Sequence, residues 1–140
     1  TTAVVFGGPV VGTTYTWSND LTSIGLGASG TGDIAGFTAI NTGLTPVTAS
    51  ITAIPTANGC TGPTRSFTIT VNPTPTVNAI TDQVVCNNTS TATVILTGPV
   101  AGTSFTWTNS LPSVGLSVNG GGSIASFTAT NTGSTTVTAN

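Results

Sequence analysis

Residues 14–26, TYTWSNDLTSIGL, return at residues 104–116 as SFTWTNSLPSVGL. The match extends on both sides: residues 1–50 align without a gap with residues 91–140, and 28 of these 50 pairs are identical. A fixed offset of this kind predicts tandem modules of about 90 residues. We expect the first module in residues 1–73, without its N-terminal strand, and the second in residues 74–140, without its C-terminal strands.

The composition indicates an all-β protein. Thr, which is β-branched and favours strands, occurs 33 times, whereas the helix formers Glu, Lys and Met are absent. Turn residues recur every 8–12 positions, which is typical of a β-sandwich of about seven strands. One Trp on the third strand of each module is the usual anchor of an immunoglobulin-like sandwich, so we expect tandem immunoglobulin-like sandwiches.

Alternation of apolar and polar residues places the expected strands. In the first module they cover residues 3–6, 13–17, 25–28, 34–39, 47–54 and Arg65–Val71. In the second they cover residues 76–80, 83–86, 93–96, 103–107, 115–118, 124–129 and 136–139. The Gly-rich stretches 27–32 and 119–122 are expected as hairpin turns, because no Lys or helix start follows them as in a phosphate loop. The expected core anchors are aromatic: Tyr15, Trp17, Phe37, Phe67, Phe105, Trp107 and Phe127.

The order of several motifs resembles a known family. VCNNTS (85–90), GTSFTWTN (102–109) and GLSVNGGGSIASFTATN (115–131) are followed by VTA, and the first module ends with NGCTG (58–62) and FTITVNPTPTV (67–77). This order resembles the PKD-like, immunoglobulin-like repeats of very large Bacteroidota surface proteins exported by type IX secretion. Some of those proteins are adhesins connected with gliding motility. The resemblance implies a secreted stalk or filament module on the cell surface, not an enzyme.

The joint between the modules is expected at Asn72, Pro73, Thr74 and Pro75. The two prolines favour an extended, stiff connection, and Asp82 is the one carboxylate nearby, so we expect the joint to be independent of calcium. The expected partners are neighbouring repeats of the same chain, with lateral association into filaments, since four charged side chains offer little repulsion between chains.

The two cysteines, Cys60 and Cys86, are disulfide candidates whose partners we expect outside the sequence. A bridge within one repeat would close a loop of about 64 residues and add about 4 kcal/mol. A bridge between adjacent or laterally packed repeats, a direct bond between Cys60 and Cys86, and free thiols remain open. Asn87 and Asn88 each begin an Asn-x-Ser/Thr triplet and are possible glycosylation sites.

The sequence lacks most of the residue types that catalytic and metal-binding sites use. Without His there is no Ser-His-Asp or Cys-His nucleophile. Asp20 and Asp33 are the only carboxylates within one module, and their counterparts at the offset of 90 are Ser110 and Ser123. We therefore expect no catalytic residue, no metal and no cofactor. One Arg and no Lys argue against nucleic acid, and no apolar run reaches the roughly 18 residues of a membrane-spanning helix.

Three functions remain to be weighed. A structural repeat accounts for the gapless repetition and the missing chemistry. A binding module would use sandwich-end loops, such as residues 18–23 or 29–32, to recognise a glycan or another surface. Ice or flat-surface binding by Thr arrays would need a flat sheet, whereas sheets twist.

Overall fold

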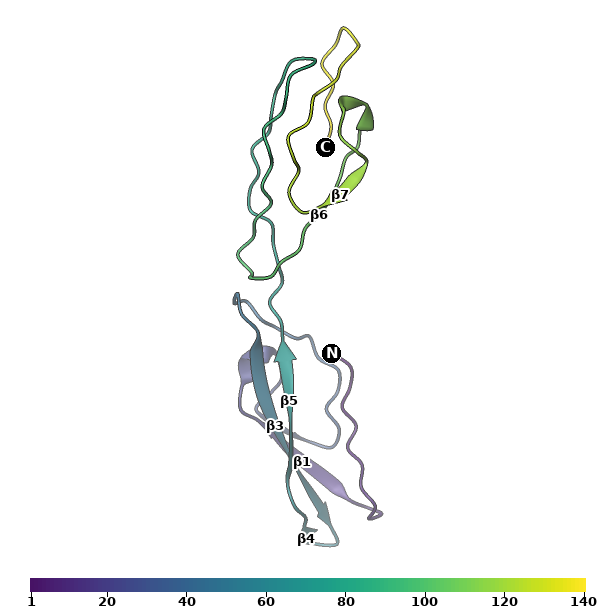
Figure 1. Cartoon of the computed structure of the whole chain (residues 1–140). Coiled ribbons are helices and arrows are strands. Elements are labelled where there is room, and N and C mark those ends of the chain that lie inside the picture. The colour runs from purple at the N-terminus through teal and green to yellow at the C-terminus, as the bar shows by residue number, and fades with distance from the viewer. The chain divides into compact units, whose positions relative to one another are not determined.

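The computed structural model describes residues 1–140 and is all-β. All of its paired strands are antiparallel, and its helical residues are two single turns of 3-10 helix. Contacts divide the chain into two compact units, Thr1–Thr74 (unit 1) and Pro75–Asn140 (unit 2). Figure 1 shows unit 1 from purple to teal and unit 2 from teal to yellow.

Unit 1 is built on one five-stranded sheet in the order β2-β1-β3-β4, in which β5 also pairs with β3 (Figure 1). Its registers pair Trp17 with Ala53 and Ile51 with Phe67. The elements of unit 1 are β1 (Thr14–Asn19), the 3-10 turn η1 (Thr22–Ile24), β2 (Ser29–Thr31), β3 (Val47–Ala57), β4 (Cys60–Thr61) and β5 (Arg65–Val71).

A two-residue turn joins β3 to β4. Asn58 and Gly59 both have positive φ, 50° and 78°, and Ala57 pairs with Cys60 across the turn. Asn-Gly is the sequence that such tight hairpins favour, because both central residues must adopt left-handed backbone. Cys60 therefore lies at the tip of a hairpin.

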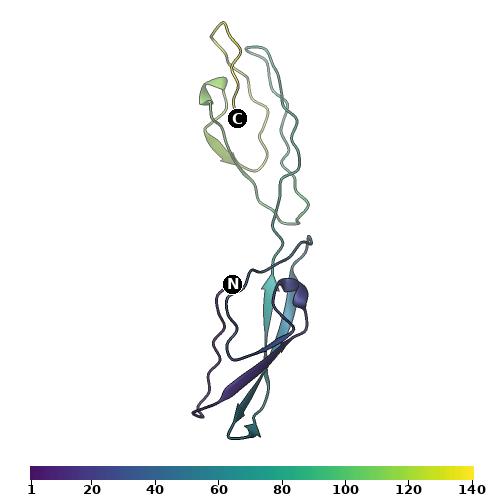
Figure 2. The same ribbon diagram turned by 180° about the vertical axis from the view of Figure 1, so that it is seen from behind.

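The core of unit 1 is aliphatic. Ile24, Leu26 and Ile34 are buried against Ala49 and Ile51 of β3, with Ile24 and Ile51 fully shielded from solvent. Two extended segments contribute to this cluster: Val4 forms an antiparallel bridge with Ile34, and Phe6 and Phe37 follow them. Figures 1 and 2 show both segments as irregular chain beside the sheet. All seven aromatics expected as core anchors are half-buried rather than fully buried.

Unit 2 has a smaller two-stranded sheet, which pairs Trp107 with Gly120. In unit 1, Ile51 of β3 covers the core, and it has no counterpart among the residues of unit 2. Its apolar residues Val114, Leu116 and Ile124 are accordingly only half-buried. The elements of unit 2 are β6 (Thr106–Thr108), the 3-10 turn η2 (Pro112–Val114) and β7 (Asn119–Gly121).

Many hydrogen bonds within unit 1 have a counterpart within unit 2, between residues 90 positions further along the chain. The bridge of Val4 with Ile34 returns as that of Val94 with Ile124. Gly25 N–H donates to Thr22 O at 3.1 Å, and Gly115 N–H donates to Pro112 O at 3.0 Å. Three further backbone N–H to C=O bonds of unit 1 recur in unit 2. They run from Asn19 to Ala28 and from Asn109 to Val118, from Gly32 to Tyr15 and from Gly122 to Phe105, and from Ile40 to Ile24 and from Thr130 to Val114.

The structure corrects several strand predictions. Residues 25–28 and 115–118 are not strands, because Gly25 and Gly115 end 3-10 turns with φ of 93° and 99°. The Gly-rich stretches expected as hairpin turns instead contain β2 and β7, which pair with the Trp strands. Strands were also expected at residues 76–80, 83–86 and 136–139, and none forms there; the counterpart of 136–139 in unit 1 pairs with β5, which unit 2 lacks. Isolated bridges replace the ladders expected at residues 3–6, 34–39, 93–96 and 124–129.

Each unit has two ends, which we name the hairpin pole and the asparagine pole. In unit 1 the hairpin pole holds β4 and the turn of residues 7–12, and the asparagine pole holds Asn41, whose Nδ2 donates to Val71 O at 2.8 Å where the chain leaves. In unit 2 the chain enters at the counterpart of the hairpin pole, where Asn78 N–H donates to Thr97 O. The asparagine pole of unit 2 holds Asn131 and the turn at Cys86.

Candidate functional site

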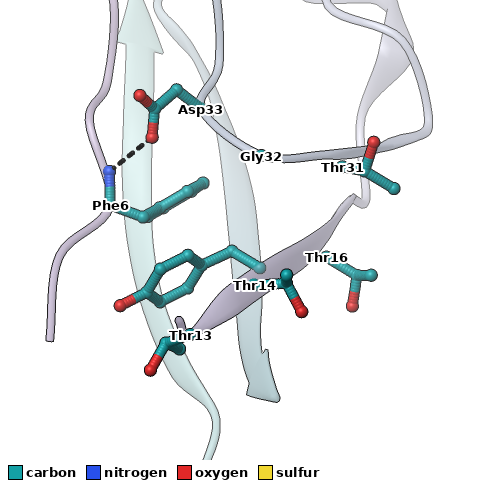
Figure 3. A pocket seen from close by; sticks show the side chains of 8 residues that line it. Phe6, Thr13, Thr14, Thr16, Thr31, Gly32 and Asp33 are labelled. Atoms are coloured by element: carbon teal, nitrogen blue, oxygen red, sulfur yellow. Dashed lines mark hydrogen bonds between the residues drawn. The ribbon is translucent and has the colours of Figure 1, made fainter. Parts of the chain in front are cut away.

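The hairpin pole of unit 1 carries a hollow of about 620 Å³ beside an aromatic pair. The rings of Phe6 and Tyr15 stack with centroids 5.4 Å apart and an interplanar angle of 28°. β1 brings Tyr15 to the hollow, and its neighbours Thr14 and Thr16 on the same strand also line it. Figure 3 shows the hollow with the hydroxyl-bearing side chains that line it; its lining residues are Phe6, Thr13, Thr14, Tyr15, Thr16, Thr31, Gly32 and Asp33.

Asp33 supplies the one charge of this hollow. Its Oδ1 accepts a hydrogen bond from Phe6 N–H at 2.9 Å, which ties the N-terminal segment to the turn after β2 (Figure 3). In unit 2, Ser123 Oγ accepts from Leu96 N–H at 3.3 Å in the same way. The acceptor is therefore structural in both units, and the carboxylate charge belongs to unit 1 alone.

Asp20 has the same kind of role. Its Oδ1 accepts from Ser50 N–H at 2.7 Å, and Ser110 Oγ accepts from Asn140 N–H at 2.9 Å in unit 2. The two carboxylates thus hold different segments of the backbone. The structure gathers no three Cys or Asp side chains into one group.

A second hollow, of about 690 Å³, shares Phe6, Thr13 and Tyr15 with the first. Pro9, Pro55 and Pro63 line it, and so do Cys60 and Arg65, the only cation among the side chains. The hairpin pole of unit 1 therefore combines exposed apolar surface, a thiol and a guanidinium.

Other residues singled out from the sequence lie apart from these hollows. The segment Asn72, Pro73, Thr74 and Pro75 contains the boundary between the units. Asn87 and Asn88 are exposed in the turn after Cys86, where Asn87 Oδ1 accepts from Asn131 N–H at 2.9 Å and Asn88 has φ of 59°. Both thiols are exposed and free.

Two structural features were not predicted from the sequence: a buried asparagine in each unit, and a Trp indole that covers a glycine. Asn19 is buried, and its Nδ2 donates to the carbonyls of Leu21, Leu26 and Gly27, while its Oδ1 accepts from Leu21 N–H. Its counterpart Asn109 is equally buried and bonds Leu116 O and Leu111 N–H. The indoles of Trp17 and Trp107 each cover a glycine of the paired strand. The signal for both features was identity between the copies at these positions.

Comparison with protein-family models, curated proteins and solved structures finds no match for this chain. No helix of the chain has the length and apolar character needed to cross a membrane.

Proposed function

We propose that this chain is a structural repeat module of a long extracellular stalk, filament or adhesin on a bacterial cell surface, without catalysis. Each unit would be an immunoglobulin-like, PKD-like sandwich, and neighbouring repeats would be its main partners. The observation that carries the proposal is the recurrence of the contacts that hold each unit together, pair by pair, at an offset of 90 residues.

The exchanges between the copies support this role. Asp33 and Asp20 are replaced by serines that keep the hydrogen bond to the backbone. The buried asparagines and the Trp–Gly pairs are kept, whereas the first hollow loses the carboxylate of Asp33 and the hydroxyls of Tyr15 and Thr31. A scaffold that is preserved while its surface chemistry varies fits an array in which each repeat contacts its neighbours.

The intact native protein tests this role. An antibody raised against the 140-residue chain should detect, under denaturing and reducing conditions, a species of hundreds of kilodaltons, because tandem repeats make long chains. External protease should remove the epitope from intact cells. A species near 13.7 kDa, the mass of this chain, that resists external protease would contradict the proposal.

Binding of a glycan at the first hollow is a second candidate, and the stacked Phe6 and Tyr15 beside Asp33 favour it. Sugars pack their apolar faces on aromatic rings and hydrogen-bond with carboxylates and hydroxyls. The counterparts in unit 2 are Leu96, Phe105 and Ser123, so the site would belong to unit 1.

Those counterparts supply conservative variants. In a glycan array, Tyr15→Phe with Asp33→Ser should lower binding about tenfold or more, because a hydroxyl and a charge are lost. The fold should be retained, since both replacements occur at the same places in unit 2. Asn72→Asp, exposed and away from the hollow, serves as the control. The absence of any bound glycan, or equal binding by the double variant, would rule out this candidate.

A further inference from the structure

The chain contains two Asn-Gly sequences, Asn58-Gly59 and Asn119-Gly120. Asparagine is one of the thermolabile residues, because the backbone nitrogen of the next residue can attack its side-chain carbonyl. Glycine in the next position favours this attack, since it has no side chain to hinder the approach and its backbone turns freely. The two sequences are alike in this respect, so the structure around each one decides which of them reacts.

The two asparagine side chains have similar access to water, because both residues are exposed. Asn58 lies in the two-residue turn between β3 and β4, at the end of unit 1 where Figure 1 labels β4. Asn119 is the first residue of β7. Since exposure does not distinguish the two asparagines, a difference in reactivity must come from the glycine nitrogens.

The backbone nitrogen of Gly59 is free. Ala57 pairs with Cys60, so Asn58 and Gly59 are the two central residues of the turn and have no partner across the hairpin. Gly59 N–H donates no backbone hydrogen bond. A Cβ added at residue 59 would meet no atom within 4 Å. The nitrogen can therefore move toward the side chain of Asn58 without breaking a bond of the sheet.

The backbone nitrogen of Gly120 is held in a ladder, because Gly120 pairs with Trp107 of β6. Two further backbone bonds flank this pair at equal steps along the strands; they run from Asn109 N–H to Val118 O and from Gly122 N–H to Phe105 O. Since hydrogen-bonded pairs alternate in an antiparallel ladder, Gly120 N–H donates to Trp107 O. The indole of Trp107 also covers Gly120. This nitrogen can attack only after β6 and β7 have separated.

We propose that Asn58 is a site of spontaneous deamidation, and that the pairing of β6 with β7 protects Asn119 from the same reaction. Each half of the argument is local, since it concerns one hairpin and the hydrogen bonds of its own two strands. The modification needs no enzyme and no reactant other than water. It is independent of the proposed role as a structural repeat.

The reaction balances with water alone. Gly59 N–H gives its proton to hydroxide, and the nitrogen forms a bond to Cγ of Asn58. The bond between Cγ and Nδ2 then breaks, and Nδ2 leaves as ammonia with a proton from water, which restores the hydroxide. Water adds to either carbonyl carbon of the resulting five-membered imide and opens it. The product is an aspartate that is linked to Gly59 through its main-chain or its side-chain carbonyl.

Deamidation would change the charge of the second hollow. Asn58 and Arg65 both line this hollow, and Arg65 is its only charged side chain. A carboxylate at residue 58 would place one anion beside this cation and would shift the net charge of the chain from −2 to −3. The main-chain linkage fits the turn, since Asp-Gly favours the same hairpin as Asn-Gly. The side-chain linkage adds one backbone atom, so the two-residue turn would no longer close on Ala57 and Cys60.

Incubation of the folded 140-residue chain in mildly alkaline buffer tests the site. Trypsin cleaves only after Arg65, so fragment 1–65 carries Asn58 and fragment 66–140 carries Asn119. Mass spectrometry measures the exchange of an amino group for a hydroxyl in each fragment. We expect fragment 1–65 to react at least about tenfold faster, because Gly120 N–H must first leave its ladder by local opening. An equal or faster reaction of fragment 66–140 would overturn the proposal.

The unfolded chain is the control for sequence. In guanidinium chloride both glycine nitrogens are free, so the two fragments should react at rates within about twofold of each other. If both fragments react in guanidinium chloride and neither reacts in the folded chain, the hairpin protects Asn58 and the proposal is wrong.

Two variants assign the reaction to one residue. Asn58→Asp should remove the fast reaction from fragment 1–65, since the product is already in place and the turn is retained. Asn119→Ser introduces the residue that stands at the counterpart position 29, and it should leave the fast reaction unchanged. A fast reaction that persists in Asn58→Asp would belong to another asparagine and would also overturn the proposal.

Discussion

Replacing Asn19 by aspartate is expected to destabilise unit 1 by about 3 kcal/mol at neutral pH, because a buried charge would face three carbonyl oxygens. The amide nitrogen of Asn19 donates to Leu21 O, Leu26 O and Gly27 O at 3.0–3.2 Å. A carboxylate oxygen at that position has no proton to donate. All three carbonyls would lose a partner in a site from which water is largely excluded.

The destabilisation should depend on pH in a defined direction. Burial and the facing carbonyls raise the pKa of the new carboxyl in the folded state above its unfolded value of about 3.9. Between these two pKa values the folded chain holds a proton that the unfolded chain has released, so the stability of the variant falls as pH rises. At about pH 4 and below, the neutral acid can still donate one hydrogen bond, and the variant is closest to the wild type.

Urea unfolding at pH 4 and pH 7 measures this difference. In a Trp107→Phe background, Trp17 fluorescence reports on unit 1 alone, and the buried indole N–H of Trp107 makes no hydrogen bond that phenylalanine would lose. Asn72→Asp, an exposed position in the same unit, is the matched control and should stay within about 0.5 kcal/mol at both pH values. Equal loss of stability by Asn19→Asp at both pH values would show that the amide is not held as described.

The long strands could be predicted from the sequence because their pattern follows burial directly. β5 has the predicted bounds, and β3 extends the predicted strand by three residues. Tyr15 and Trp17 alternate with Thr along β1, as a strand with one buried face requires. In unit 2 the same alternation around Trp107 yields only three strand residues, because the chain holds no counterpart of most of β3.

The short strands and the site could not be predicted, because the types of residue at these positions suggested a different structure. The Gly-rich stretches that contain β2 and β7 were expected as turns, although Gly30 and Gly120 are required by a neighbouring indole rather than by the backbone. The largest fully buried side chains are those of isoleucines, whereas large aromatics were expected in the core. The first hollow depends on Phe6 and Asp33, which are 27 positions apart, and no local pattern reports that they meet.

Replacing Gly30 by alanine is expected to destabilise unit 1 by about 3 kcal/mol through overpacking. Gly30 pairs with Trp17 across β1 and β2, and a Cβ at residue 30 would lie 2.7 Å from Cε2 of the indole. The indole cannot move away freely, because Trp17 also packs against the buried cluster of unit 1. The strain would therefore reach both the β1–β2 pairing and the core. Hydrogen exchange of the β3 amides, which pair with β1, measures the loss.

Two further variants separate this clash from the general effect of adding a methyl group. Gly7→Ala places a Cβ where no atom lies within 4 Å, and it should leave exchange nearly unchanged. In a Trp17→Val background the indole is gone, so Gly30→Ala should cost less than about 1 kcal/mol, and the double-mutant cycle should show a coupling of about 2 kcal/mol. If alanine at residue 30 cost as much without the indole as with it, the glycine would be required by its backbone.

In unit 2, Trp107 pairs with Gly120, and a Cβ added at residue 120 would lie 2.6 Å from Cε2 of the indole, so we expect the same coupling there. Thus the Trp and the Gly of each copy are retained as one unit of packing, while residues 29 and 31 differ from their counterparts 119 and 121.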